Sequence, residues 1–180
     1  IMITKILNVI TLSRILCAIL IYLILYLESS YSVALFLFLI ASFSDFLDGY
    51  LARKTNSESV LGEILDPIAD KLLIVFVLIG LSINLDSFLI GFISAVIISR
   101  EIWVAALRDI NSRNNQSDKT RVTFLAKTKT AIQMLAILMY LFGLTINNMM
   151  VLFFADIILI IALLVTIHTG FQYTISTFKK

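Results

Sequence analysis

Four aspartates stand close together in a chain that is otherwise mostly apolar: Asp45, Asp48, Asp66 and Asp70. Side chains three or four residues apart lie on one face of an α-helix, so the first two aspartates share one stripe and the last two share another. The link between the stripes, at 54–61, is short, which predicts that the two helices are antiparallel neighbours. The four carboxylates are therefore expected to converge on one small site.

Four negative charges at one site repel one another unless protons or cations neutralise them. Ligation by oxygen favours Mg2+, Mn2+ or Ca2+, and one cysteine and one histidine are too few for a zinc cluster. Gly49, Ala52 and Gly62 continue the two stripes and leave room for a bulky ligand beside Arg53. Helix capping or ordinary ion pairing would explain a lone aspartate, but four on two stripes favour two metals assisting an in-line displacement at phosphorus.

The composition indicates an integral membrane protein. Of the 180 residues, 60% are hydrophobic and 14% charged, and the mean hydropathy is +1.02. The apolar runs of about 20 residues match a hydrocarbon core of about 30 Å, and they lack the alternation of a membrane barrel. Arg14 interrupts the first run, so we interpret that run as a membrane helix and not as a signal peptide. We expect one domain over 1–180.

The fold predicted is all-α, a polytopic membrane protein with six transmembrane helices at 6–27, 33–53, 63–83, 88–110, 122–145 and 149–173. The connections "ESSY", "NLDS" and "TINN" carry no Lys or Arg. The opposite side receives the bases Lys5, Arg53, Lys54, Arg108, Arg113, Lys119, Arg121, Lys179 and Lys180. The positive-inside rule therefore places both termini and the two longer connections in the cytoplasm, with the chain in the inner (cytoplasmic) membrane.

Charged residues inside the spans cluster toward the cytoplasmic ends of the helices. Beside the four aspartates these are Arg14, Lys71, Arg100, Glu101, Lys127 and Lys129. An ionisable group in a membrane costs several kcal/mol unless it is paired or lines water, so we expect one polar cavity open to the cytosol. Asp156, toward the outer side, has no explanation in this pattern.

Four bases are candidates for holding a phosphorylated acceptor: Arg100, Arg108, Lys127 and Lys129. A dianion that enters a cavity of low dielectric constant needs fixed positive partners. The alternative for the two lysines is binding of lipid headgroups. Glu101 is expected to orient one of these bases.

The pattern Asp45-x2-Asp48-Gly49-x2-Ala52-Arg53-x8-Gly62-x3-Asp66-x3-Asp70 resembles the signature of the CDP-alcohol phosphatidyltransferase family. The resemblance implies a six-helix membrane enzyme, usually a homodimer, which transfers a phosphatidyl group from a CDP-linked lipid to an alcohol and releases CMP. It assigns two metal ions, Mg2+ or Mn2+, to Asp45, Asp48, Asp66 and Asp70. It also makes Asp70 the general base toward the acceptor hydroxyl.

The same resemblance assigns the CDP-lipid to residues of the first three helices. Gly49, Arg53 and Ser59 contact it, together with the segment Asn8–Thr11, "NVIT". Ala52 and Gly62 leave space for it.

The stretches "LNVITLSRI", "LDPIADK", "SREIWVAALRD" and "KTKTAIQM" resemble the phosphatidylglycerophosphate synthases of this family. Leu7 stands where proline is usual, and Ala126 where glycine is usual. The resemblance implies transfer of the phosphatidyl group from CDP-diacylglycerol to glycerol 3-phosphate. Membrane lipids are expected as further partners, and nucleic acid is not. Inositol phosphate or phosphatidylglycerol as acceptor remains open. A divalent-cation transporter is the alternative from another class, although its site would belong near the bilayer midplane.

Overall fold

A computed structural model of the chain describes residues 2–55, 60–114 and 124–179, and the side chains of 9–44, 65–114 and 128–179. The described residues form six helices: α1 (Met2–Tyr26), α2 (Tyr31–Thr55), α3 (Val60–Asn84), α4 (Phe88–Arg113), α5 (Phe124–Thr145) and α6 (Met149–Phe178). The all-helical prediction is confirmed. The largest differences are at the start of α1, which begins at Met2 and not at residue 6, and at the end of α6, which continues to Phe178 and not only to residue 173.

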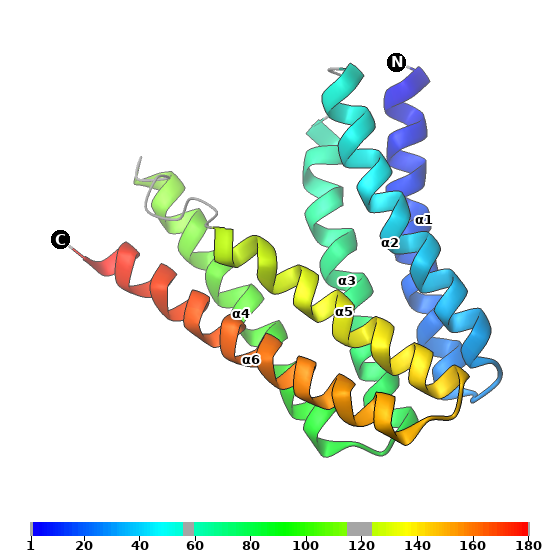
Figure 1. Ribbon diagram of the computed structural model, residues 1–180. Coiled ribbons are helices and arrows are strands. Elements are labelled where there is room, and N and C mark those ends of the chain that lie inside the picture. Colours follow the sequence, from blue (N-terminus) through cyan, green and yellow to red (C-terminus); the bar gives the residue numbers. More distant parts are fainter. Residues whose placement is uncertain (1, 56–59, 115–123, 180) are drawn as a thin grey trace.

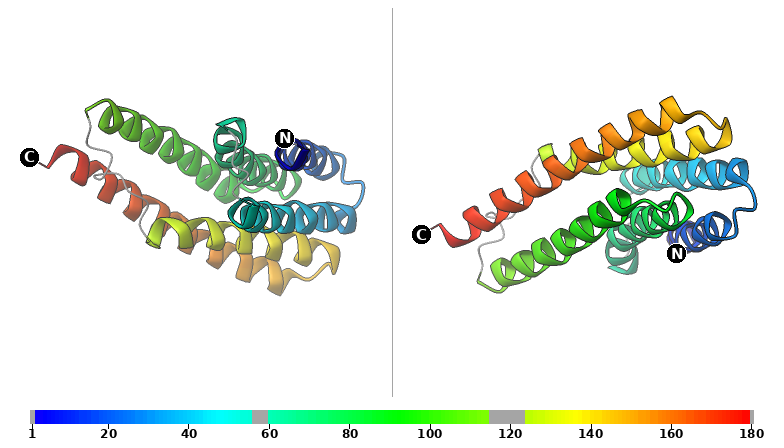
Figure 2. Two further views of the ribbon diagram at one scale, coloured as in Figure 1. Left: turned by 90° about the horizontal axis from the view of Figure 1, so that it is seen from above. Right: turned by 90° about the horizontal axis from the view of Figure 1, so that it is seen from below.

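The helices are arranged in two layers (Figure 2). One layer contains α1, α3 and α4, and the other contains α2, α5 and α6. Within the layers α3 packs against α1 and α4, and α5 packs against α2 and α6, while α1–α2, α4–α6 and α3–α5 contacts join the layers. In Figure 1 the three short turns gather at the lower end, whereas the opposite ends of α1–α3 and of α4–α6 diverge.

The three short connections are the same kind of turn. Glu28, Asp86 and Asn147 have positive φ values of 49°, 45° and 51°. Each turn carries the two backbone hydrogen bonds of a Schellman motif, at 3.0–3.3 Å, which satisfy carbonyls at the end of the preceding helix. Ser87 and Asn148 then cap α4 and α6 with their side chains. We call this part of the molecule the turn end and the other part the open end.

The apolar core lies in the half of each helix next to the turns. All six helices contribute to it, for example Leu25 of α1, Phe38 of α2 and Ile137 of α5. Toward the open end the buried side chains include many polar or charged ones: Thr11, Arg14, Asn111, Lys129, Gln133, Thr166 and Thr169. Apolar packing therefore joins the helices near the turns, whereas polar side chains lie between them toward the open end.

Four stretches of the described residues are long and apolar enough to cross a membrane: Val9–Tyr26, Phe88–Arg113, Thr128–Thr145 and Met149–Phe178. A shorter apolar stretch, Tyr31–Ser44, lies in α2. The chain is thus a multi-pass membrane protein. The prediction of six spans is supported for four of them.

Candidate functional site

A cavity of about 210 Å³ lies between α3, α4 and α5. Its lining includes Asp70 together with Arg100, Arg108 and Lys129, three of the four bases predicted to hold an acceptor phosphate. The side chain of Lys127 lies outside the described residues. The volume is far above the roughly 15 Å³ that one water needs, so the cavity has room for a small polar molecule.

Two of the four predicted aspartates lie one helical turn apart on α3 and contact α1. Thr11 donates a hydrogen bond from Oγ1 to Oδ1 of Asp66, at 2.7 Å. Arg14 donates from Nη1 to Oδ1 of Asp70, also at 2.7 Å. Arg14 is fully buried, and an ionised guanidinium inside a helix bundle requires a negative partner of this kind. Arg14 was noticed in the sequence as a charge within a span, but its pairing with Asp70 was not predicted.

The metal site predicted from the sequence also needs Asp45 and Asp48, whose side chains lie outside the described residues. Among the side chains that the structure describes, no group of three or more His, Cys, Asp and Glu residues could hold a metal ion. The donor set nevertheless fits the predicted ions, because carboxylate oxygens are the ligands of Mg2+ and Mn2+. Of these carboxylates, that of Asp70 already contacts one cation, the guanidinium of Arg14.

The residues predicted to bind the CDP-lipid are described only in part. Thr11 is buried beside Asp66. The backbones of Asn8, Gly49, Ala52, Arg53 and Gly62 belong to α1, α2 and α3. Their side-chain environments, like the whole of Ser59, lie outside the described residues.

Helix α6 holds the arginines of α4, and this arrangement was not predicted from the sequence. Arg100 donates from Nη2 to Thr169 Oγ1 at 3.0 Å. The centre of the Tyr173 ring lies 5.6 Å from Cζ of Arg100 and 5.5 Å from Cζ of Arg108, within the range of cation–π contacts. A Cβ on Gly170 would meet Cγ of Arg100 at 3.1 Å, so the glycine makes room for this side chain.

A signal for this face of α6 is present in the sequence. Thr166, Thr169, Gly170 and Tyr173 follow helical spacing and form one stripe of polar or small residues in a very apolar helix.

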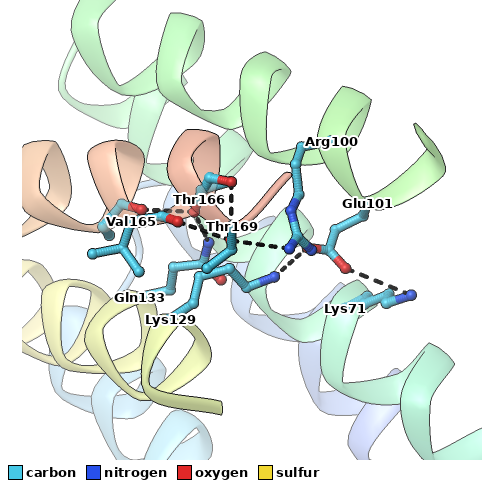
Figure 3. A network of polar contacts seen from close by, with 9 residues as sticks. Lys71, Arg100, Glu101, Lys129, Gln133, Val165, Thr166 and Thr169 are labelled. Carbon is cyan, nitrogen blue, oxygen red and sulfur yellow. Dashed lines mark hydrogen bonds and ion pairs between the residues drawn. The ribbon is translucent and has the colours of Figure 1, made fainter. Parts of the chain in front are cut away.

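Glu101 contacts cations of three helices in a polar network that extends to Thr166 and Thr169 of α6 (Figure 3). Its carboxylate pairs with Lys129 of α5, with Arg100 Nη1 at 2.9 Å and with Lys71 Nζ of α3 at 3.6 Å. The Nε atoms of Arg100 and Arg108 are buried and have no hydrogen-bond partner within the described part of the chain. Buried guanidinium donors without partners are costly, so these groups are suited to receive an anion.

Asp156, which the sequence pattern left unexplained, accepts a hydrogen bond from the hydroxyl of Tyr140. Tyr140 is buried in the apolar core. This pair lies on α5 and α6 in the half next to the turns, away from the cavity, and it satisfies a polar group of each helix.

Comparison with known proteins gives the family. Residues 5–168 match the family model of CDP-alcohol phosphatidyltransferase. A protein of Rickettsia bellii is 40% identical over 169 residues, covering 92% of this chain and 91% of its own length. A protein of Haemophilus influenzae is 38% identical, covering 81% of this chain and 77% of its own length. A protein of Escherichia coli is 31% identical, covering 72% of each chain. The chain belongs to the CDP-alcohol phosphatidyltransferase family.

All three relatives carry the name CDP-diacylglycerol--glycerol-3-phosphate 3-phosphatidyltransferase. The family predicted from the aspartate pattern is therefore confirmed.

Proposed function

We propose that this protein transfers the phosphatidyl group of CDP-diacylglycerol to glycerol 3-phosphate, giving phosphatidylglycerol phosphate and CMP. Family membership and the names of the relatives support this activity over a divalent-cation transporter. They also favour glycerol 3-phosphate over inositol phosphate or phosphatidylglycerol as the acceptor. The observation that carries the acceptor assignment is the cavity in which Asp70 lies with Arg100, Arg108 and Lys129.

In this proposal the cavity binds glycerol 3-phosphate by its phosphate. Arg100 and Lys129 contact the phosphate oxygens, with Arg108 and Lys127 contributing further positive charge. Asp70 accepts the proton of the primary hydroxyl as that oxygen attacks the phosphorus bearing diacylglycerol. The P–O bond to CMP breaks, and CMP leaves. Arg14 orients the Asp70 carboxylate from α1, because it donates a short hydrogen bond to it.

CDP-diacylglycerol is proposed to bind along α1, α2 and α3, on the side of the aspartates opposite the cavity for glycerol 3-phosphate. Asp45, Asp48, Asp66 and Asp70 would hold two Mg2+ or Mn2+ ions, which neutralise charge on phosphate oxygens when bound. The nucleotide-lipid would lie along residues of α1, α2 and α3 and the link between them: Asn8, Thr11, Gly49, Ala52, Arg53, Ser59 and Gly62. Thr11 supports this placement because its hydroxyl lies against Asp66.

We further propose that the open end faces the cytoplasm and that the protein forms a homodimer in the inner membrane. The three turns at the opposite end contain no Lys or Arg, which supports this orientation by the positive-inside rule. Both CDP and glycerol 3-phosphate are then on the side of the cavity.

The acceptor assignment is tested with purified protein, CDP-diacylglycerol and a panel of alcohols, followed by identification of the lipid product. We expect phosphatidylglycerol phosphate from glycerol 3-phosphate, poor use of glycerol and loss of activity with a chelator. Lys129→Ala should raise the KM for glycerol 3-phosphate about tenfold to hundredfold, because one charge-assisted contact is lost. The KM for CDP-diacylglycerol should change much less. Equal turnover of glycerol and glycerol 3-phosphate would contradict the assignment.

The orientation is tested by labelling single cysteines in intact cells, in a Cys17→Ser background. Ser30→Cys at a turn should react with an impermeant thiol reagent. Ser112→Cys, near the end of α4, should react only after the cells are opened. The reverse pattern would place the cavity on the wrong side of the membrane for its substrates.

A further inference from the structure

The Glu101 carboxylate contacts cations from three helices. Lys71 comes from α3, Arg100 from α4 and Lys129 from α5, and Figure 3 shows these side chains around Glu101. The side chains of Lys129 and Arg100 are 6% and 9% exposed, and that of Glu101 is 17% exposed. Water therefore screens these three charges poorly, and their interactions are stronger than on a protein surface. The side chain of Lys71 is 43% exposed, so water weakens its contact with Glu101 at 3.6 Å.

Without an anion between them, the three cations would repel one another. One carboxylate against three cations leaves a surplus of two positive charges around Glu101. A phosphate dianion has the charge that balances this surplus. In the protein without substrate, Glu101 therefore supplies the negative charge that keeps the cations close together.

The cations differ in how they depend on Glu101. Arg100 is also held by α6, through Thr169 and the ring of Tyr173. The Glu101 contacts, in contrast, connect α4 to α3 and α5. Lys71 directly follows Asp70 in the sequence, so Glu101 links the proposed phosphate site to the turn of α3 that carries the proposed base.

We propose that Glu101 is an internal counter-ion of the acceptor site and a determinant of its specificity. It occupies the cations until a phosphate competes for them, which weakens the binding of any anion. It also holds the cations where a bound phosphate places the acceptor hydroxyl at Asp70, which makes it a positioning residue. The positioning role rests on the proposed function, whereas the counter-ion role concerns only the binding of an anion.

The proposal predicts opposite changes in binding and turnover. Glu101→Gln keeps the shape of the side chain and removes its charge, so inorganic phosphate should bind about tenfold more tightly, or more, than to the wild type. Turnover should fall about tenfold or more because the cations lose their common partner. A merely structural role would weaken both together.

The experiment measures binding of radiolabelled inorganic phosphate to the full-length protein by equilibrium dialysis, without lipid or alcohol. The kcat and both KM values are determined on the same preparations. Asp109→Asn is the matched control, since Asp109 lies on the same helix and pairs with Arg113 at the surface, at 2.8 Å. This control should equal the wild type in phosphate affinity and turnover.

Glu101→Asp provides a second variant in case Glu101→Gln does not fold. A shorter carboxylate cannot reach all three cations at once, so this variant should bind phosphate several-fold more tightly than the wild type and turn over more slowly. Phosphate affinity that is unchanged or lower in a folded Glu101 variant would overturn the proposal. If the Glu101 variants bind phosphate more tightly but the wild type does not use glycerol 3-phosphate in the alcohol panel, the counter-ion role stands. Only the assignment of the acceptor would then be wrong.

Discussion

The turn end and the open end of this protein are built from the same six helices but from different chemistry. At the turn end, three Schellman turns hold the helices close, and the buried side chains are mainly aliphatic or aromatic. At the open end the helices diverge, Arg14 and Lys129 are buried, and Arg100 and Lys129 line a cavity.

This difference separates the source of stability from the place of chemistry. Apolar side chains that fit tightly leave no room for a substrate, whereas buried charges cost free energy and must be held by partners. Because the core joins all six helices near the turns, the open end can keep costly charges without losing the fold. Substitutions at the two ends should therefore change different measurements.

The largest effect on activity is expected for Asp70→Asn. The amide keeps the size of the side chain but cannot accept the hydroxyl proton, so turnover should fall by about 10²- to 10⁴-fold in a CMP-release assay. Asp86→Asn makes the same chemical change in the turn that joins α3 to α4 and should leave turnover unchanged. Near-normal turnover of a folded Asp70→Asn protein would refute the role of Asp70 as the base.

The turn end should show the reverse behaviour with Ile137→Ala. Ile137 is completely buried in the core, so its truncation should reduce the free energy of unfolding by about 2–5 kcal/mol. Turnover per folded molecule should stay near the wild-type value. Leu135→Ala is the control, because Leu135 of the same helix is 47% exposed. The comparison fails if Ile137→Ala reduces turnover without a change in thermal stability.

A smaller effect is expected from adding one methyl group at each end. Gly170→Ala should displace Arg100, whose Cγ lies 3.1 Å from the new Cβ, and raise the KM for glycerol 3-phosphate about threefold to tenfold. Gly143→Ala should instead press on Cδ2 of Leu152, at 2.8 Å, and reduce thermal stability with little change in that KM. An equal rise of KM in both variants would show that the two ends are coupled.

The sequence predicted the helices well because each apolar run has the length of a membrane span and each break is polar. It also identified the family, since the aspartate pattern combines many fixed spacings. It did not predict the contact of Tyr173 with Arg100 and Arg108, because residue type alone does not distinguish this aromatic residue from the others in the apolar helices. Glu101 was expected to orient one base, whereas the structure shows it in contact with three cations.

The sequence by itself determined the all-helical membrane fold, the family and the residues proposed for the chemistry, because all of these depend on residue type and on spacing along one helix. Only the tertiary structure decided which charges meet. Arg14 pairs with Asp70, and Glu101 joins Lys71 and Lys129, across pairs of helices whose relative rotation is not encoded in either helix alone. That rotation depends on how the apolar core packs near the turns, where the fit of many side chains acts at once.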